Sequence, residues 1–177
     1  MLAGVRPRIR YLLIRGQLLV GVYSIGLVKG DYYVNGGAGA QQLLINSGVT
    51  GIEIAGGMER VDFAYNSFDL AFKVNGLQIQ ILNGSNVIAT ISTNDTAGGT
   101  ELAFKNGGLK ISLDSSDPQN PAFSLTGANG SSQSIPLNSQ ENVSLDKSFI
   151  LNSSLTSNVG GGGTPGTGDD TVTIDLT

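Results

Sequence analysis

The chain has 177 residues, a formal net charge of −4 at pH 7, and neither Cys nor His. The lack of these residue types excludes a disulfide framework, a thiol nucleophile, a thiolate zinc site and a histidine general base. The acidic balance argues against nucleic acid as the main partner. Charged residues make up only 14% of the sequence, whereas Gly occurs 26 times, which is typical of an exported, all-β structural module.

Residues 1–42 are predicted to form basic, apolar N-terminal strands. The segment 1–30 contains five basic and no acidic side chains, whereas the remainder of the chain has a net charge of −9. Short β-prone runs alternate with glycines in this region, although the same stretch also has features of a secretory leader. The uncharged part of this apolar stretch, residues 16–28, is shorter than the roughly 18–20 residues of a transmembrane helix, so we expect no membrane span.

Strands as apolar as these need cover on both faces and are candidates for pairing with another chain. A second such strand is predicted at the C-terminal end, in residues 169–177. The residues predicted to carry assembly are Tyr11, Leu12, Ile14, Leu18, Val20, Val172, Ile174 and Leu176.

Residues 43–158 are predicted to form the main β domain. The pair Asn75-Gly76 lies between two β-prone runs and predicts a tight hairpin in which both residues adopt positive φ, and Asn83-Gly84 predicts the next turn. Helical periodicity of apolar residues is absent. The predicted fold is therefore all-β with negligible helix, either an antiparallel β-sandwich or a short β-solenoid, built from Gly/Asn-turn hairpins.

A short segment of the main domain occurs twice. Residues 70–79 and 102–111 are identical at seven positions, and both copies predict a strand, a glycine turn and a second strand. Duplicated hairpins suit a sandwich or a solenoid, in which one unit buries its apolar face against the next. Chance similarity between two hairpins is the alternative.

The string IEIAGGMERVDF, from Ile52 to Phe63, precedes Asn66-Ser67, then VIATI at 87–91 and TELAF at 100–104. This succession resembles modules of very large bacterial surface proteins, namely type I-secreted RTX-like adhesins, hemolysin-like surface proteins and S-layer-related proteins. The resemblance covers about residues 48–113. It implies an extracellular structural module without catalysis, either secreted or on the bacterial cell surface.

Residues 159–168 are glycine-rich and predict a flexible linker before the C-terminal strand. That strand could add to the sheet of a neighbouring subunit or fold back onto its own chain. Gly168-Asp169-Asp170 resembles the opening of an RTX calcium repeat, which makes calcium a candidate cofactor. The candidate ligands are Asp114, Asp117, Asp169 and Asp170, and the alternative interpretation of these residues is ordinary turn caps.

We expect no enzymatic activity. Glu59 with Asp62, or Asp62 with Asp69, could form a glycosidase-like carboxylate pair, but residues 59–62 are more simply a strand with a salt-bridged outer face. A carbohydrate- or cell-surface-binding module of a secreted protein is the alternative function, and loss of glycan binding in Tyr65→Ala would favour it.

The leading hypothesis is a non-catalytic extracellular structural protein. It would be a self-assembling subunit of a filament or surface layer, or an adhesin module, held by strand addition between subunits. The opposite charges of the N-terminal block and the rest of the chain suggest head-to-tail contact. The expected partners are further copies of the chain or neighbouring modules of a surface protein, with a glycan as another candidate.

Overall fold

The structure is a computed structural model that describes residues 10–12, 21–25, 32–35, 41–55, 58–92, 99–157, 159 and 170–174. In the strands over 10–12, 21–25 and 170–174 only the backbone is described.

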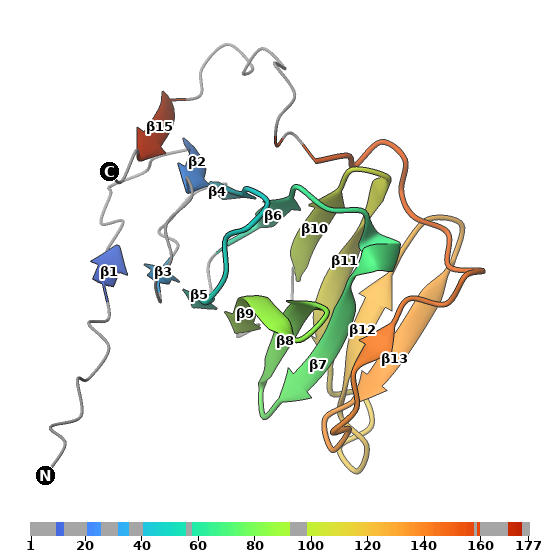
Figure 1. Ribbon diagram of the computed structural model, residues 1–177. Helices are drawn as coiled ribbons and strands as arrows, with labels where there is room; N and C mark the ends of the chain where they lie inside the picture. The colour runs from blue at the N-terminus through green and yellow to red at the C-terminus, as the bar shows by residue number, and fades with distance from the viewer. Residues whose placement is uncertain are drawn as a thin grey trace, which may run out of the picture.

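Two mixed β-sheets make up the described part of the chain (Figure 1). In spatial order, sheet A consists of β1 (Arg10–Leu12), β3 (Tyr32–Asn35), β5 (Ile52–Ala55), β9 (Asn86–Ser92), β8 (Gln78–Asn83), β7 (Ala71–Asn75) and β14 (Val143–Ser144). Sheet B consists of β13 (Ser132–Pro136), β12 (Ala122–Thr126), β11 (Gly107–Asp114), β10 (Thr100–Phe104), β6 (Arg60–Phe63), β4 (Gln41–Ile45), β2 (Gly21–Ile25) and β15 (Asp170–Ile174). The one helical turn of the described residues is the 3-10 turn η1 (Ser67–Asp69). The all-β prediction is therefore confirmed.

The N-terminal half is a parallel coil. Successive strands alternate between the sheets, and each strand pairs in parallel with the next strand of its own sheet. Tyr32 pairs with Ile52 in sheet A and Gly21 with Gln41 in sheet B, so both sheets advance by the same length of chain per turn of the coil at these points. This arrangement is the solenoid alternative that the sequence left open.

The second half is mainly antiparallel, although β9 and β10 still pair in parallel with β5 and β6. The hairpin β7–β8 is inserted after β6 and extends sheet A, and strands β11, β12 and β13 extend sheet B as a meander. The parallel coil is thus followed by a two-sheet sandwich. Among the described residues, the predicted Gly/Asn-turn hairpins occur only in this second part, because the strands of the coil pair in parallel.

One continuous core fills the space between the sheets. The alternation of strand side chains places Val61 and Phe63 inside, and Phe63 stacks on Phe104 with ring centroids 5.6 Å apart. Burying a Leu, Ile or Phe side chain stabilises the fold by about 1.5–3 kcal/mol, so this core is the main stabilising element. The largest fully buried side chains are Phe63, Phe72, Phe104, Phe123, Leu43, Ile45, Ile52, Ile54, Leu70, Ile79, Ile81 and Ile88.

The hairpin expected at Asn75-Gly76 is present, but its loop is displaced by one residue. Asn75 pairs with Gln78 at the end of the ladder, so Gly76 and Leu77 form the loop. Gly76 has a φ of 63°, whereas Leu77 keeps a negative φ. Glycine at the first loop position is the pattern of a type II′ turn, and the expected positive φ at Asn75 is wrong.

Gly76→Val should lower the free energy of unfolding by about 1–2 kcal/mol, because a side chain at positive φ is strained. A Cβ at Gly76 would meet no atom within 4 Å, so the cost comes from the backbone alone. Urea denaturation would measure it. Asn tolerates this conformation, so Gly76→Asn should lose less, and equal losses in both variants would contradict the explanation.

The duplicated segment does not correspond to one repeated turn. Gly76 and Leu77 form the loop of the first copy, whereas Lys105 and Asn106 form that of the second, between paired Phe104 and Gly107. When the two copies are aligned by sequence, their loops therefore fall at different positions.

The predicted boundaries fall within continuous structure or outside the described residues. The boundary between 1–42 and 43–158 lies inside β4 (Gln41–Ile45). Of the linker 159–168, only residue 159 is described.

Candidate functional site

A segment that follows β14 lies across the outer face of sheet B. Gly108, Ala103 and Asp62 are neighbours in register on β11, β10 and β6. Ala103 and Asp62 are fully buried although they face away from the core. Residues 149–157, called the strap here, cover this row, because a Cβ added to Gly108 would lie 2.5 Å from Leu155 Cγ. At this row the outer face of sheet B is therefore buried as well.

Backbone hydrogen bonds hold the strap to the sheet. Asn152 N donates to Gly108 O at 2.8 Å, and Gly108 N donates back to Asn152 O at 2.9 Å. Further along, Ser157 N donates to Phe104 O at 2.9 Å. The strap needs small residues beneath it for its backbone to come this close.

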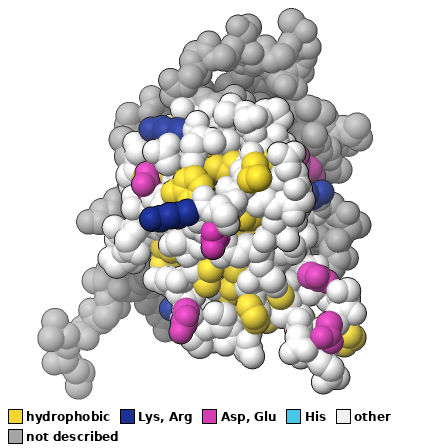
Figure 2. Space-filling view, turned by 90° about the vertical axis from the view of Figure 1, so that its right-hand side faces the viewer, with side chains coloured by type: hydrophobic (Ala, Val, Ile, Leu, Met, Phe, Trp, Pro, Cys, Tyr) yellow, Lys and Arg dark blue, Asp and Glu magenta, His cyan; other side chains and the backbone are white. Residues whose placement is uncertain are grey.

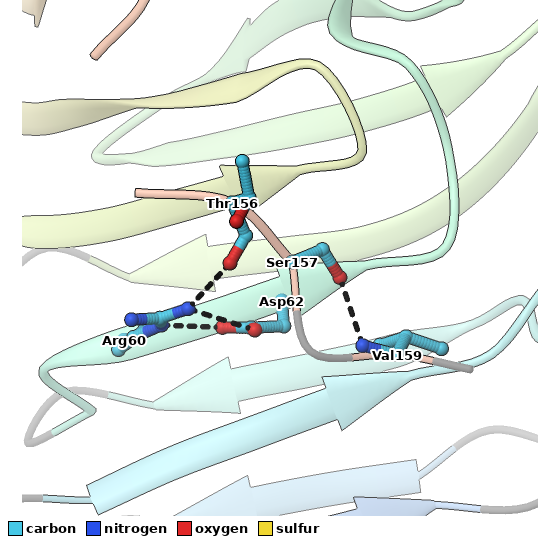
Figure 3. A network of polar contacts seen from close by, with 5 residues as sticks. All are labelled: Arg60, Asp62, Thr156, Ser157 and Val159. Carbon is cyan, nitrogen blue, oxygen red and sulfur yellow. Dashed lines mark hydrogen bonds and ion pairs between the residues drawn. The ribbon is translucent and has the colours of Figure 1, made fainter. Parts of the chain in front are cut away.

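An ion pair on β6 anchors the end of the strap (Figure 3). Arg60 Nε lies 2.6 Å from Asp62 Oδ1, and Arg60 Nη2 lies 3.0 Å from Asp62 Oδ2. Arg60 Nη2 also donates to the carbonyl oxygen of Thr156 in the strap at 2.8 Å. Asp62 is fully buried, whereas the Arg60 side chain is 24% exposed. The salt-bridged strand predicted over residues 59–62 is therefore present, but its carboxylate is covered rather than displayed.

A second polar contact fixes η1. Ser67 is fully buried, and its N–H donates to Asn106 Oδ1 at 2.9 Å. Asn106 Nδ2 donates back to Ser67 Oγ at 3.1 Å. Arg60, Asp62 and Ser67 all belong to the string that resembles surface-protein modules, and all three hold the fold together.

One end of the molecule is sealed by short polar strands. Its edge strands are β14, which has two residues, and β13, which carries Pro136. Leu137 N donates to Pro121 O, so the register places the nitrogen of Pro136 toward the free edge, where it offers no N–H. Short strands and proline discourage edge-to-edge pairing. Figure 2 views this side and shows small groups of apolar side chains among mostly uncharged polar atoms.

The side chain of Gln133 joins the two sheets at the sealed end. Gln133 Nε2 donates to Ser144 O at 3.1 Å, and Asp146 N donates to Gln133 Oε1 at 3.1 Å. A groove of about 390 Å³ lies here. It is lined by Ser131, Ser132, Gln133, Ser144, Asp146, Ser148 and Phe149.

The other end carries the two terminal strands. The outermost strands there are β1 in sheet A and β15 in sheet B, and Figure 1 shows them on the same side of the molecule, away from β13. Both run parallel to their neighbours, as successive turns of the coil do. We call this end, formed by β1 and β15, the open end. Further strands could pair there in parallel, as the next turn of the coil would.

The structure places part of the predicted assembly set at the open end. Tyr11 and Leu12 lie in β1, and Val172 and Ile174 lie in β15. The strand β15 pairs with β2 of its own chain, which is the fold-back alternative for the C-terminal strand. The other predicted residues, Ile14, Leu18, Val20 and Leu176, lie outside the described residues.

Two of the four calcium candidates cap turns. Asp114 is the last residue of β11, and Asp117 lies in the loop that leads to β12. Asp114 Oδ1 accepts from Ser116 N and Asp117 Oδ1 from Gln119 N, each at 3.0 Å. These are the turn-cap contacts that the sequence offered as the alternative. The described residues contain no cluster of three or more potential metal ligands.

The other two calcium candidates lie at the C-terminal strand. Asp169 is outside the described residues, and Asp170 begins β15, of which only the backbone is described.

The same capping contacts lower the pKa of Asp114, Asp117 and Asp146 below their ordinary value of 3.8. The Ser116 N–H lowers that of Asp114, the Asn120 side chain that of Asp117 and the Ser148 hydroxyl that of Asp146. NMR titration should therefore give carboxyl pKa values below 3.8 for all three.

The lowered carboxyl pKa values also predict that the stability of the protein depends on pH. A lowered folded-state pKa stabilises the fold above the unfolded-state pKa, and this stabilisation is lost as pH falls through the folded-state value. The Tm should therefore decrease as the pH is lowered below about 4, and this decrease should be less steep in Asp146→Asn. Carboxyl pKa values at or above 3.8 would contradict the prediction.

Tyr65 is part of the scaffold. Its hydroxyl accepts a hydrogen bond from Gly48 N at 2.9 Å, and its partly buried ring packs against the core. Both its hydroxyl and its ring therefore contribute to the fold.

Sequence reasoning missed three features of this region: the strap, the glycines beneath it and the link made by Gln133. The sequence does contain one signal for the strap, the pair Gly107-Gly108. The hairpin pattern, however, predicts a turn at these two glycines. Both residues belong to β11, and a Cβ on either would collide with the strap.

The described residues contain no helix with the length and hydropathy to cross a membrane. A scan of protein-family models gave no match, and neither the curated proteins nor the solved structures contain a protein that matches this chain.

Proposed function

We propose that this chain is a non-catalytic structural module of a secreted or bacterial-surface protein, and that it associates by strand addition at its open end. The observation that carries the proposal is the difference between the two ends. Strands β13 and β14 close one end with proline, short length and the Gln133 link. Strands β1 and β15 leave the other end with the parallel geometry of a continuing coil. Open strand edges bind other strands through main-chain hydrogen bonds.

The geometry favours association through one end over head-to-tail growth. Head-to-tail contact needs complementary surfaces at opposite ends, whereas β1 and β15 lie at the same end. Two copies that bind each other through these strands would therefore form a closed dimer, open end against open end. Within a longer surface protein, the same end would stack on preceding turns of a coil.

The polar residues of the resembling string also support a structural role. Arg60 and Asp62 anchor the strap, and Ser67 anchors η1. These structural contacts account for the spacing of the three residues in the sequence. An extracellular location rests on the composition and on the resemblance to surface-protein modules.

Proline substitutions in β1 test the proposal on the full chain. Successive residues of a strand direct their N–H groups to opposite sides, so either Tyr11→Pro or Leu12→Pro removes a donor from the free edge. We expect full-length protein to associate in light scattering after size exclusion, and one of these variants to lose that association while its circular dichroism stays unchanged.

The matched control lies at the sealed end. Ser132 begins β13. The preceding residue, Ser131, directs its backbone groups toward the neighbouring chain segment, because its carbonyl oxygen accepts from Gly127 N. The N–H of Ser132 therefore faces outward, toward the free edge. Ser132→Pro should therefore fold and associate as the unmodified chain does. Association that survives both β1 prolines but is lost in Ser132→Pro would overturn the proposal.

Glycan binding is a second candidate, favoured by the groove at the sealed end. The groove offers a carboxylate, several hydroxyls and a carboxamide, which are groups that bind sugar hydroxyls. A glycan array probed with the full chain and with Asp146→Asn tests this candidate, with Asp114→Asn as the control for a distant exposed carboxylate. Binding lost only in Asp146→Asn would support it, and a silent array would reject it.

A further inference from the structure

We propose that β15 occupies the place of a coil strand and that a second copy of this chain can supply that strand instead. The partner would be an identical chain that donates its own residues 170–174 to β2. This inference rests on the proposed function, because it names the strand that is added at the open end.

The first argument is the direction and register of β15. Strands β2, β4, β6 and β10 run parallel to one another in sheet B, as successive turns of the coil. The strand β15 continues this series, with Asp170 paired to Gly21 and Ile174 to Ile25 in parallel. A strand from an earlier turn of the coil would take the same place and direction. The edge of β2 therefore accepts a parallel strand whatever the connection of that strand to the rest of the protein.

The second argument is the connection of β15 to its own domain. The last described contacts before it are those of Thr156 and Ser157 with the sheet and of Val159 N with Ser157 Oγ. The segment 160–169 then separates Val159 from β15, and residues 160–168 of it belong to the glycine-rich linker noted above. A strand at the end of such a linker is joined to the rest of its domain by sequence that favours a flexible connection. Exchange of such an element between identical chains creates no new interface and needs only a different connection.

The third argument is charge. Residues 1–30 carry five basic residues and no acidic ones, and residues 169–177 carry Asp169, Asp170 and Asp175 and no basic ones. The C-terminal segment is thus opposite in charge to the N-terminal block, which contains β2. The same complementarity guides a donated strand toward β2 of another copy, and salt weakens it.

Mass action sets the condition for exchange. A tethered strand has an effective concentration of about 1 mM for a short flexible linker, so donation by a second copy competes when copies are comparably concentrated. Refolding mixed chains together at high concentration gives both arrangements the chance to form.

Engineered disulfides provide the test, since the chain has no Cys of its own. Ser24 pairs with Thr173 in the register of β2 and β15, and neighbouring strands are about 4.8 Å apart, within the range of Cα separations of a disulfide. One full-length chain carries Ser24→Cys and a second, distinguished by a longer tag, carries Thr173→Cys. The two are refolded together and oxidised.

Exchange predicts a disulfide-linked species with the summed mass of both tagged chains on a non-reducing gel. The control mixture replaces Thr173→Cys by Ser115→Cys, which is exposed in the loop between β11 and β12. It should give no such species above the background of random oxidation. Higher ionic strength during refolding should reduce the cross-linked fraction.

The double variant Ser24→Cys with Thr173→Cys in one chain completes the design. Exchange predicts a closed monomer at low concentration and a covalent dimer at high concentration. A closed monomer at every concentration, together with no cross-link in the mixture, would overturn the inference. Association that remained sensitive to the β1 prolines would then leave the proposed function intact, so the two failures are distinguishable.

Discussion

Arg60→Ala is expected to lower the free energy of unfolding by about 3–5 kcal/mol, the usual effect of removing one partner of a buried ion pair. Asp62 is fully buried on the outer face of sheet B and accepts two hydrogen bonds from the guanidinium. The substitution takes the positive charge from that carboxylate and also removes the bond to Thr156. Urea denaturation followed by circular dichroism would measure the loss.

Two further variants show which part of the interaction matters. Glu101 is the exposed neighbour of Arg60 on β10, and Glu101→Ala should change stability by less than about 0.5 kcal/mol, as for other surface substitutions. Arg60→Met combined with Asp62→Leu should recover most of the loss, since apolar side chains can replace a buried pair. A loss in Arg60→Ala no larger than in Glu101→Ala would show that the ion pair is not a stabilising anchor.

The all-β class was predictable because its signals are local. Alternation over residues 60–63 gives the inward and outward faces of β6, and short β-prone runs between glycines give the other strands. The hairpin at Gly76 was also predictable, although the loop position was not. Both Asn75-Gly76 and Gly76-Leu77 are plausible two-residue loops, and only the pairing of Asn75 with Gln78 decides between them.

The parallel coil was predictable only as an alternative. Parallel partners such as Tyr32 and Ile52 are separated in the sequence by a full turn of the coil and share no repeated motif, so no periodic pattern marks one turn. Antiparallel hairpins, in contrast, are marked by the turn that joins their strands. The sequence therefore describes the second half of the fold more fully than the first.

The candidate site shows the same division between local and distant determinants. Arg60 and Asp62 are close neighbours on one strand, so their pairing follows from the sequence. The burial of Asp62 does not, because the strap that covers it, residues 149–157, comes from a distant part of the chain. Likewise, Gly127 has no local feature that shows which segment will pass over it.

Gly127→Ala is expected to destabilise the protein by about 3 kcal/mol, at the upper end of the cost of overpacking. A Cβ at this position would lie 2.1 Å from the carbonyl oxygen of Ile150 and 2.7 Å from Phe149 Cε1. A backbone oxygen cannot rotate away, so the strap must shift and strain the 2.7 Å hydrogen bond from Ala128 N to Ile150 O. Urea denaturation would measure the effect, and limited proteolysis would report cleavage within the loosened strap.

The control is a glycine with free space around it. Gly130 has a φ of 75°, and a Cβ there would meet nothing within 4 Å. Gly130→Ala should therefore cost only about 1–2 kcal/mol of backbone strain. Equal losses in the two alanine variants would refute the steric explanation.

A double-mutant cycle shows whether the two ends of the strap act together. Gly127 lies under the beginning of the strap, and Arg60 binds Thr156 near its end. If the strap detaches as a unit, Gly127→Ala already removes part of what Arg60 stabilises. The loss in the double variant should then be smaller than the sum of the single losses by more than about 0.5 kcal/mol, the deviation found for independent sites. Additive losses would mean that each contact holds the strap separately.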